Sequence, residues 1–462
     1  MLKRKIDSVL NNWLHSRKQA LMITGARQVG KTYSIMQFIK KNFKYIIHID
    51  FSKDVELIDT FVNLHNSEDL LLKLSAIKGE LLKPNKTVIF FDEIQIVYKR
   101  RETLIKIGKL DSFTQDLVSS LKSGVEQGEY RFILSGSLLG VTLNNILLNP
   151  TGYLDTYFMY PLDFEEFLMA KHVGKTSIDY LRECFFNEKP VDEEINKLFL
   201  SYFKEYVLIG GMPEAVDTYF KTKNLYNVQL SQEQILNVYE KDIFDYITDS
   251  GKKLRIKNIY QSIPSQLNCQ NKKFILSEVI DKNYLKSKKI DDEFLWLTNA
   301  YIALPVYNVN EPSIPLTLNS ERRNIKLFMN DIGLLDAALF STGIRKKILN
   351  NEATINFGAP YENVVAEILW ANGFNDKVFY YSSKKHGEID FVVEYKGEIL
   401  PIEIKSGKPS DMTVYNHTAL NNVLKIYPIK KAYIFGNSNV IKANDKIVQL
   451  PIYMVTFLKN KD

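Results

Sequence analysis

The residues best suited to chemistry lie together near the start of the chain and fit the spacing G-x-x-x-x-G-K-T. They are Gly25, Ala26, Arg27, Gln28, Val29, Gly30, Lys31 and Thr32. Glycines at the two ends of such a loop let backbone N–H groups curl around phosphate oxygens. Lys31 can then reach the terminal phosphates, and the Thr32 hydroxyl can bind Mg²⁺. The loop therefore predicts a binding site for ATP, with Mg²⁺ as its cofactor.

A pair of carboxylates follows an apolar run further along the chain. Residues 87–91 read Thr-Val-Ile-Phe-Phe, and Asp92 and Glu93 come directly after them. In a sheet that carries a phosphate loop, the carboxyl end of this strand lies near the phosphates. Asp92 is then suited to the Mg²⁺ shell, and Glu93 to polarising the water that attacks the terminal phosphate.

A second pattern that could do chemistry lies near the end of the chain. Asp390, Glu403 and Lys405 belong to a predicted hairpin that turns at Lys396-Gly397. If the turn has two residues, Asp390 lies opposite Glu403, and the two-residue period of a strand places Lys405 on the same face as Glu403. The carboxylates could hold Mg²⁺ while the lysine activates water for attack on a phosphodiester. The same residues could equally form an inactive salt-bridge cluster, and a bulge at the turn would remove the opposition.

The elements that must position the nucleotide loop have suitable patterns. Residues 20–23 form an apolar strand before the loop, and residues 35–39 have helical periodicity after it. A further apolar strand, residues 131–134, ends at Ser135 and Ser137. Either serine hydroxyl could sense the terminal phosphate or the water, or could equally form a turn. Strands that alternate with helices predict an α/β fold.

The positive charge of the chain is concentrated in one segment. Residues 251–290 contain ten Lys and Arg residues against Glu278 and Asp281, a net charge of +8, whereas the whole chain carries +6. Apolar residues at helical spacing should turn these cations outward, where they could contact DNA phosphates without sequence specificity. A solvated helical face explains the same pattern equally well.

Length and composition limit the remaining possibilities. The 462 residues are enough for about three domains of roughly 150 residues each. Without an apolar run of about 20 residues no membrane span is expected, and an amphipathic stretch follows the basic N-terminus where a signal peptide would need an apolar core. Only two cysteines are present, and no histidine has metal-ligand spacing. We therefore expect a protein of the reducing cytoplasm.

Taken together, these residues resemble a known family: prokaryotic AAA-type ATPases fused to a C-terminal restriction-endonuclease-like, or PD-(D/E)xK, domain. The resemblance rests on the nucleotide loop and on the runs 91–95, 134–137, 160–167, 210–214, 330–335 and 361–363. It implies a P-loop ATPase core whose sensor strand lies beside the P-loop strand, at residues 1–160. It further implies a helical lid at 161–246, a winged helix at 247–340 and an α/β nuclease-like domain at 341–462.

The resemblance also assigns residues. Glu362 matches an acidic residue that the nuclease superfamily often adds as a metal ligand. Relatives usually carry Gly-Arg where this chain has Gly152-Tyr153. Because an arginine there could stabilise charge in the transition state, its absence predicts slow, switch-like hydrolysis. AAA-type relatives often form rings, which makes a homo-oligomer an expectation by analogy.

Two functional hypotheses follow. In the first, the protein is an ATP-driven switch on DNA that positions its nuclease-like domain. In the second, it is an ATP-dependent signalling or scaffolding protein that recruits a protein partner and whose nuclease-like fold is inert.

Overall fold

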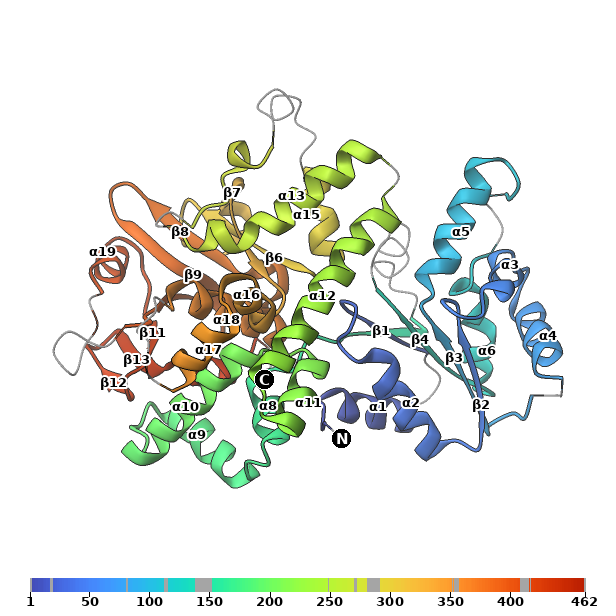
Figure 1. The fold of residues 1–462 in the computed structure, drawn as a ribbon, viewed down its shortest axis with the longest axis horizontal. Helices are drawn as coiled ribbons and strands as arrows, with labels where there is room; N and C mark the ends of the chain where they lie inside the picture. Colours follow the sequence, from blue (N-terminus) through green and yellow to red (C-terminus); the bar gives the residue numbers. More distant parts are fainter. Residues whose placement is uncertain are drawn as a thin grey trace. The chain divides into compact units, whose positions relative to one another are not determined.

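The computed structural model describes residues 2–16, 20–79, 82–111, 115–137, 152–247, 249–269, 272–280, 291–350, 352, 357–407, 415 and 417–460. The chain divides into two compact units (Figure 1). The N-terminal unit comprises residues 3–160 with 299–301, and the C-terminal unit comprises residues 1–2, 161–298 and 302–462.

The N-terminal unit is built on a five-stranded sheet in the order β2-β3-β4-β1-β5. All neighbouring strands are parallel. The strands are β1 (Ala20–Thr24), β2 (Tyr45–Asp50), β3 (Thr87–Asp92), β4 (Arg131–Gly136) and β5 (Leu154–Phe158). Strands β1 and β3 are buried along their whole length, which explains their unbroken apolar sequences. Strand β4 lies between β3 and the P-loop strand β1, as the family resemblance implies.

Helices cover this sheet. They are α1 (Ile6–His15), α2 (Lys31–Asn42), α3 (Ile58–Val62), α4 (Ser67–Lys78), α5 (Gln95–Lys106) and α6 (Lys122–Gln127). Alternate strand residues such as Met22, Ile49 and Phe91 share one core with residues of α3 to α6. Their sequence neighbours point to the opposite face because successive side chains of a strand alternate.

The C-terminal unit begins with a series of helices. They are α8 (Phe164–Ala170), α9 (Lys175–Asn187), α10 (Glu193–Ile209), α11 (Pro213–Thr222), α12 (Leu225–Tyr246), α13 (Ser250–Leu267) and α15 (Asp291–Asn299), whose last residue is assigned to the N-terminal unit. Helices α16 (Ile332–Leu339), α17 (Thr342–Leu349), α18 (Gly358–Leu369) and α19 (Thr418–Ile426) follow later in the chain.

An eight-stranded mixed sheet completes the C-terminal unit, in the order β12-β13-β11-β10-β9-β8-β6-β7. Its strands are β6 (Ala303–Val309), β7 (Ser320–Met329), β8 (Phe379–Ser383), β9 (Gly387–Tyr395), β10 (Glu398–Ile404), β11 (Ala432–Gly436), β12 (Ile441–Lys442) and β13 (Ile447–Pro451). Strands β6 and β7 lie within residues 247–340, the range expected for the winged helix. They extend the same sheet as the C-terminal strands, so the winged helix and the division at 340/341 stay predictions.

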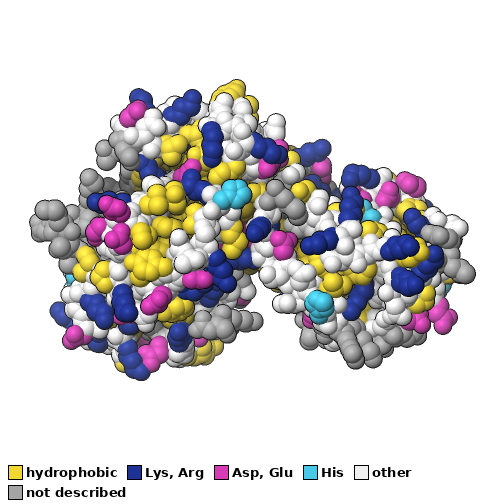
Figure 2. All heavy atoms as spheres, turned by 90° about the horizontal axis from the view of Figure 1, so that it is seen from below, with side chains coloured by type: hydrophobic (Ala, Val, Ile, Leu, Met, Phe, Trp, Pro, Cys, Tyr) yellow, Lys and Arg dark blue, Asp and Glu magenta, His cyan; other side chains and the backbone are white. Residues whose placement is uncertain are grey.

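The surface and the helices give two further observations. On the face drawn in Figure 2, Lys and Arg side chains are spread over both units with acidic side chains among them. Among the described residues, no helix is both long and apolar enough to cross a membrane.

Candidate functional site

The predicted nucleotide loop joins β1 to α2. Gly30, with φ 92°, is the N-cap of α2, so the N–H groups of the first helical turn point toward the loop. A side chain at Gly25 is excluded, because a Cβ atom there would lie 2.2 Å from the carbonyl oxygen of Met159. Lys31 is buried, and its Nζ donates to the carbonyl oxygens of Gly25 and Ala26 at 2.9 and 2.8 Å. The loop is therefore a compact turn with its lysine folded against it.

Arg4 supports the loop from outside the motif, and sequence reasoning missed it. Its guanidinium donates to the carbonyl oxygen of Val29 at 3.0 Å and to that of Tyr160 at 2.8 Å. The side chain is only 8% exposed. Arg4 thus ties the loop to the segment that follows β5. No signal in the sequence identifies it, since the basic N-terminus looks like an ordinary charged end.

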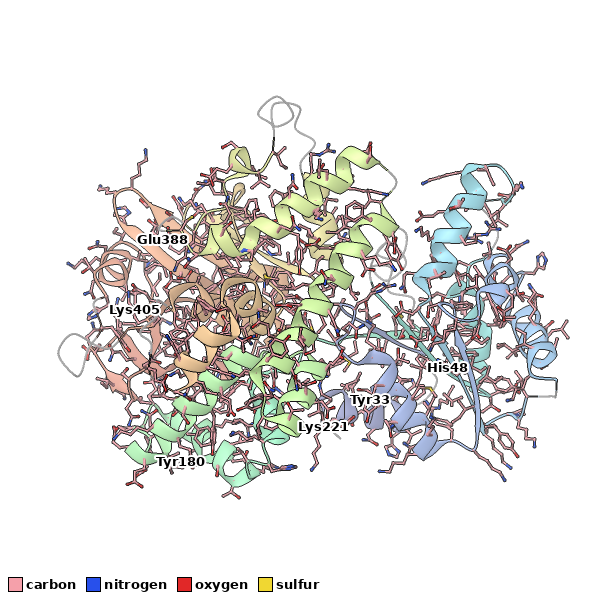
Figure 3. All side chains as sticks on the ribbon, in the orientation of Figure 1. Tyr33, His48, Tyr180, Lys221, Glu388 and Lys405 are labelled. Carbon is pink, nitrogen blue, oxygen red and sulfur yellow. The ribbon has the colours of Figure 1, made fainter. Side chains whose placement is uncertain are left out.

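Asp92 lies at the carboxyl end of β3 and makes several polar contacts. It is 1% exposed, and the Ser135 hydroxyl donates to its Oδ1. His48 Nε2 lies 3.7 Å from its Oδ2, and Figure 3 labels His48 on the sheet of this unit. Burial raises the pKa of Asp92, but interactions with His48 and with the Ser135 and Thr32 hydroxyls outweigh burial and hold the pKa below its usual value. Asp92 is therefore a buried carboxylate that faces Thr32.

Glu93 follows Asp92 in an unusual backbone conformation. Its φ is 56°, and its carboxylate accepts a hydrogen bond from the side-chain amide of Gln95. Gln95 is 2% exposed, and its Oε1 has no hydrogen-bond partner among the described residues. A positive φ is uncommon for a residue other than glycine and occurs often at functional sites. Glu93 is thus held by the backbone and by one amide neighbour.

Three residues on which the sequence left questions can now be placed. Ser135 binds Asp92, whereas the Ser137 hydroxyl is buried and has no partner among the described residues. Tyr153 donates its hydroxyl to the carbonyl oxygen of Val118 at 3.2 Å. Tyr153 thus packs against the core of the N-terminal unit.

In the C-terminal unit, the hairpin register predicted from the turn is confirmed. Glu398 pairs with Tyr395, and the ladder continues to Ile402 and Phe391. Asp390 and Glu403 are the next residues along this register. The Asp390 carboxylate accepts the backbone N–H of Ile404 at 2.8 Å.

A lysine contacts the carboxylate of Glu403. Lys405 Nζ lies 2.5 Å from Glu403 Oε1, and the second carboxylate oxygen of Glu403 is buried without a hydrogen-bond partner among the described residues. Burial raises the pKa of Glu403, and the repulsion from Asp390 adds to this, whereas Lys405 lowers it. The lysine of the predicted D…E-x-K set thus lies beside its glutamate.

Lys326 of β7 is a residue that sequence reasoning missed. It is fully buried, and its Nζ lies 2.6 Å from Glu388 Oε1 and 3.7 Å from Glu362 Oε2. Lys272 pairs with the other oxygen of Glu362. Figure 3 labels Glu388 and Lys405 on the C-terminal unit. The acidic centre of the C-terminal unit is therefore neutralised by lysines from separate parts of the chain.

Metal binding at this centre has no support from the geometry of the described residues. Within the ranges given above, no group of three or more His, Cys, Asp and Glu side chains is arranged to hold a metal ion. Glu362, Asp390 and Glu403 come near one another, but lysine ammonium groups contact two of the three.

The basic segment 251–290 is also largely neutralised where it is described. Lys252 pairs with Asp292 at 3.7 Å, Arg255 with Glu293 at 2.8 Å and Lys257 with Glu240 at 3.1 Å, and Lys272 pairs with Glu362. Residues 270–271 and 281–290, with four of its lysines, lie outside the described residues. Most of the described cations thus have an internal partner.

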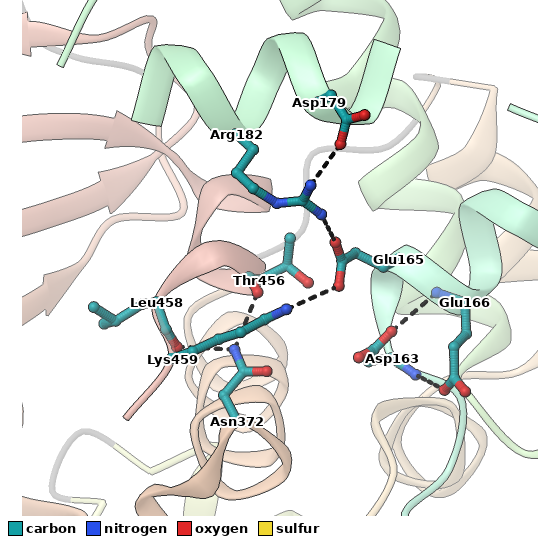
Figure 4. Close-up of polar contacts among 9 residues, drawn as sticks. All are labelled: Asp163, Glu165, Glu166, Asp179, Arg182, Asn372, Thr456, Leu458 and Lys459. Carbon is teal, nitrogen blue, oxygen red and sulfur yellow. Dashed lines mark hydrogen bonds and ion pairs between the residues drawn. The ribbon is translucent and has the colours of Figure 1, made fainter. Parts of the chain in front are cut away.

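Residues 160–167 anchor the start of the C-terminal unit (Figure 4). They are one of the runs on which the family resemblance rests, and no chemistry was assigned to them. Asp163 and Glu166 form a capping box at the start of α8. The buried Glu165 pairs with Arg182 at 2.6 Å and with Lys459 at 3.4 Å. The end of the chain and helix α9 thereby hold α8 in place.

Three of the runs that carry the family resemblance meet in the core of the C-terminal unit, namely 160–167, 210–214 and 330–335. The backbone N–H of Leu162 donates to the carbonyl oxygen of Gly211 at 2.7 Å, and the N–H of Gly211 donates to Asp331 at 2.6 Å. A Cβ atom at Gly211 would lie 2.1 Å from the Leu162 carbonyl oxygen. Burial raises the pKa of Asp331 to about 6, although backbone N–H groups oppose this. These runs therefore fix the packing of helices.

Comparison with known proteins adds family-level findings for three parts of the chain. Residues 17–168 match the AAA domain family. Residues 200–346 match a domain of unknown function, DUF8612, and residues 357–455 match another, DUF4143. A protein of Methanocaldococcus jannaschii, itself uncharacterised, is 24% identical over 379 residues, which cover 80% of this chain and 71% of that protein.

Three solved structures are similar at low TM-scores. The Walker-type ATPase of Pyrococcus abyssi has TM-score 0.40 and 14% identity, and the match covers 74% of this chain and 96% of that one. Caenorhabditis elegans PCH-2 has TM-score 0.28 and 14% identity over 51% of this chain and 68% of that one. The Orc1 protein of Aeropyrum pernix, in complex with DNA, has TM-score 0.27 and 10% identity over 72% and 90%. TM-scores this low do not transfer a function. The AAA match, the strand order and the loop geometry together support a P-loop ATPase core of AAA type that binds nucleotide.

Proposed function

We propose that the protein binds ATP with Mg²⁺ at the loop Gly25 to Thr32 and hydrolyses it slowly. The observation that carries this proposal is the convergence of Thr32, Asp92 and Ser135 at the carboxyl edge of the sheet, next to the loop that contains Lys31. Parallel sheets of this kind bind their ligands at this edge.

The residues present fit a Mg²⁺ ion. Mg²⁺ prefers oxygen ligands, and the Thr32 hydroxyl and the Asp92 carboxylate supply them. The low pKa of Asp92, despite its burial, keeps this carboxylate charged at neutral pH. When bound, the ion would offset the negative charge of the phosphates.

The chain's own groups account for the other steps. The N-terminal turn of α2 and Lys31 hold the phosphates, and Glu93 orients the attacking water. Ser135 fixes the Asp92 carboxylate in one orientation. Because residue 153 is a tyrosine, no arginine at that position stabilises the transition state, and turnover should be slow.

Nucleotide binding and single-turnover phosphate release test this proposal. Lys31→Ala should weaken binding of a fluorescent ATP analogue at least about 100-fold, since a charged donor to the phosphates is lost. Glu93→Gln should bind normally and release phosphate about 100-fold more slowly. The matched control is Lys106→Ala, an exposed lysine of α5. Unchanged binding in Lys31→Ala would overturn the proposal.

We further propose that nucleotide state governs an interaction with DNA. The net charge of +6 supports an anionic partner, and such binding should weaken steeply with salt. The test is the ATPase rate with and without DNA across a salt series. Nucleotide binding that is indifferent to DNA at every salt concentration would count against this role.

A second candidate function, an ATP-dependent scaffold with an inert nuclease-like fold, has one observation in its favour. Lysines contact Glu362 and Glu403, where a nuclease would need oxygen ligands free for a metal. Mg²⁺-dependent cleavage of a DNA panel separates the two functions. Cleavage by the wild type that Asp390→Ala abolishes without unfolding would exclude the scaffold and support the predicted nuclease site.

A further inference from the structure

The histidine of the edge strand β2 lies beside Asp92, the carboxylate that fits Mg²⁺ in the proposed ATP site (Figure 3). His48 and Phe90 are partners in the ladder between β2 and β3, and their rings are stacked with centroids 4.7 Å apart and an interplanar angle of 7°. His48 Nε2 is buried, lies 3.7 Å from Asp92 Oδ2 and has no hydrogen-bond partner among the described residues. The stacking therefore holds a ring nitrogen next to a carboxylate oxygen at the nucleotide edge of the sheet.

The two oxygens of Asp92 have different surroundings. The Ser135 hydroxyl and the backbone N–H of Glu93, the latter at 3.1 Å, both donate to Oδ1, whereas Oδ2 faces His48. The distance of 3.7 Å between Nε2 and Oδ2 is too long for a hydrogen bond. Two donors that each lie about 2.1 Å from one ion are about 3.0 Å apart at a right angle and about 4.2 Å apart in line. The two atoms are thus spaced so that one metal ion could contact both.

The neighbouring carboxylate, Asp50 at the end of β2, is held by other groups. Asp50 is the ladder partner of Asp92. Its Oδ1 accepts a hydrogen bond from the Ser52 hydroxyl at 2.6 Å, and its Oδ2 lies 2.7 Å from Lys53 Nζ. Because Lys53 offsets the charge of Asp50, the carboxylate that remains for a cation at this edge is Asp92.

We propose that His48 Nε2 joins Asp92 and Thr32 as a ligand of the cation at the nucleotide site, and that the site consequently accepts a divalent transition-metal ion in preference to Mg²⁺. This inference rests on the proposed ATP site and concerns the identity of its cation. Mg²⁺ takes oxygen ligands, whereas imidazole suits ions such as Fe²⁺, Ni²⁺ and Zn²⁺. Among the described residues, no three His, Cys, Asp or Glu side chains are arranged to hold a metal. Phosphate oxygens would complete the coordination, so the ion binds together with the nucleotide.

The test uses the full chain without a histidine tag. Binding of the fluorescent ATP analogue is followed at increasing concentrations of Ni²⁺ or Mg²⁺, which gives the apparent affinity for each ion. The variant His48→Phe keeps a ring stacked on Phe90 and removes the nitrogen. Its affinity for Ni²⁺ should fall at least about 10-fold, and its affinity for Mg²⁺ should fall much less. The matched control His65→Phe changes an exposed histidine between α3 and α4 of the same unit and should leave both affinities unchanged.

A spectroscopic measurement separates coordination by His48 from a purely structural role. Pulsed electron paramagnetic resonance of the wild type with ATP and Mn²⁺ should show coupling of the metal to a nitrogen nucleus, and His48→Phe should lose this coupling.

Two results would overturn the inference and leave the ATP site standing. One is an equal loss of affinity for Ni²⁺ and Mg²⁺ in His48→Phe, because His48 would then only pack against Asp92. The other is a wild-type Mn²⁺ complex without the nitrogen coupling. A wild type that binds the ATP analogue with neither ion would instead overturn both the inference and the proposed ATP site.

Discussion

Replacing Glu362 by glutamine should stabilise the C-terminal unit above pH 7 and leave its stability unchanged below about pH 5. The carboxyl is buried, and burial together with repulsion from Asp390 raises the pKa of Glu362 to about 7. The ion pairs with Lys326 and Lys272 lower the pKa but do not outweigh these effects. Glutamine imitates the protonated side chain and cannot become charged.

The magnitude follows from the two protonation equilibria. In the unfolded chain the carboxyl loses its proton near pH 4.5, whereas in the folded unit it keeps the proton to about pH 7. Between these values the folded state binds more protons, so the free energy of unfolding falls as the pH rises. The gap corresponds to about 3 kcal/mol at about 1.4 kcal/mol per pH unit. This loss should be absent from Glu362→Gln.

Hydrogen exchange of α18 and β9 is the suitable assay, because it reports local opening in a chain whose two units need not unfold together. Opening free energies, corrected for intrinsic exchange, are compared at pH 5 and pH 8 for the wild type, Glu362→Gln and the exposed control Glu352→Gln. A glutamine variant that is no more stable than the wild type at pH 8 would refute the reasoning. So would strong stabilisation of the wild type alone by added Mg²⁺, since Glu362 would then serve as the metal ligand that the family resemblance implies.

Three further predictions concern other parts of the molecule. Ser135→Ala removes a hydrogen bond to the Asp92 carboxylate, so the pKa of Asp92 should rise and single-turnover hydrolysis should slow roughly 10- to 100-fold, with affinity for the ATP analogue nearly unchanged. Gly211→Ala places a methyl group 2.1 Å from a carbonyl oxygen and should cost about 3 kcal/mol in thermal melting. The control Gly343→Ala meets nothing within 4 Å and should gain up to about 1 kcal/mol. Asp163→Ala removes the capping box of α8 and should cost about 1 to 2 kcal/mol in the same melting assay.

The nucleotide site could be foreseen because its signals are local. The loop is contiguous in the sequence, and β1 and β3 are recognisable there as unbroken apolar runs. Arg4 could not be foreseen, because its two acceptors lie 25 and 156 residues away in the sequence. A side chain whose known acceptors lie this far away in the sequence leaves no pattern in its own neighbourhood.

In the C-terminal unit, too, features set by neighbouring residues could be predicted, whereas contacts between distant segments could not. The register of β9 and β10 followed from the two-residue turn, whereas the sheet partners of β6 and β7, which lie in the range expected for the winged helix, did not follow from the sequence. Their membership of an eight-stranded sheet depends on pairing with β8, which begins 50 residues after β7 ends. Lys326 was missed for a related reason. It lies between Ile325 and Leu327 in an alternating strand, a pattern that predicts a solvent-facing lysine, and only tertiary packing shows that this face is covered by Glu362 and Glu388.

The tight turn between β9 and β10 limits how this chain can be engineered. Lys396 and Gly397 have φ values of 52° and 76°, the left-handed pair that matches the twist of a two-residue hairpin. One inserted residue would have to be absorbed as a bulge or as a slip of one strand. A slip would turn Glu403 toward the apolar side and bring a neighbouring isoleucine into the charged centre. Fluorophores, affinity tags and fusion partners therefore belong at other sites, whereas a deliberate single-residue insertion here offers a way to disassemble the acidic centre without altering any of its side chains.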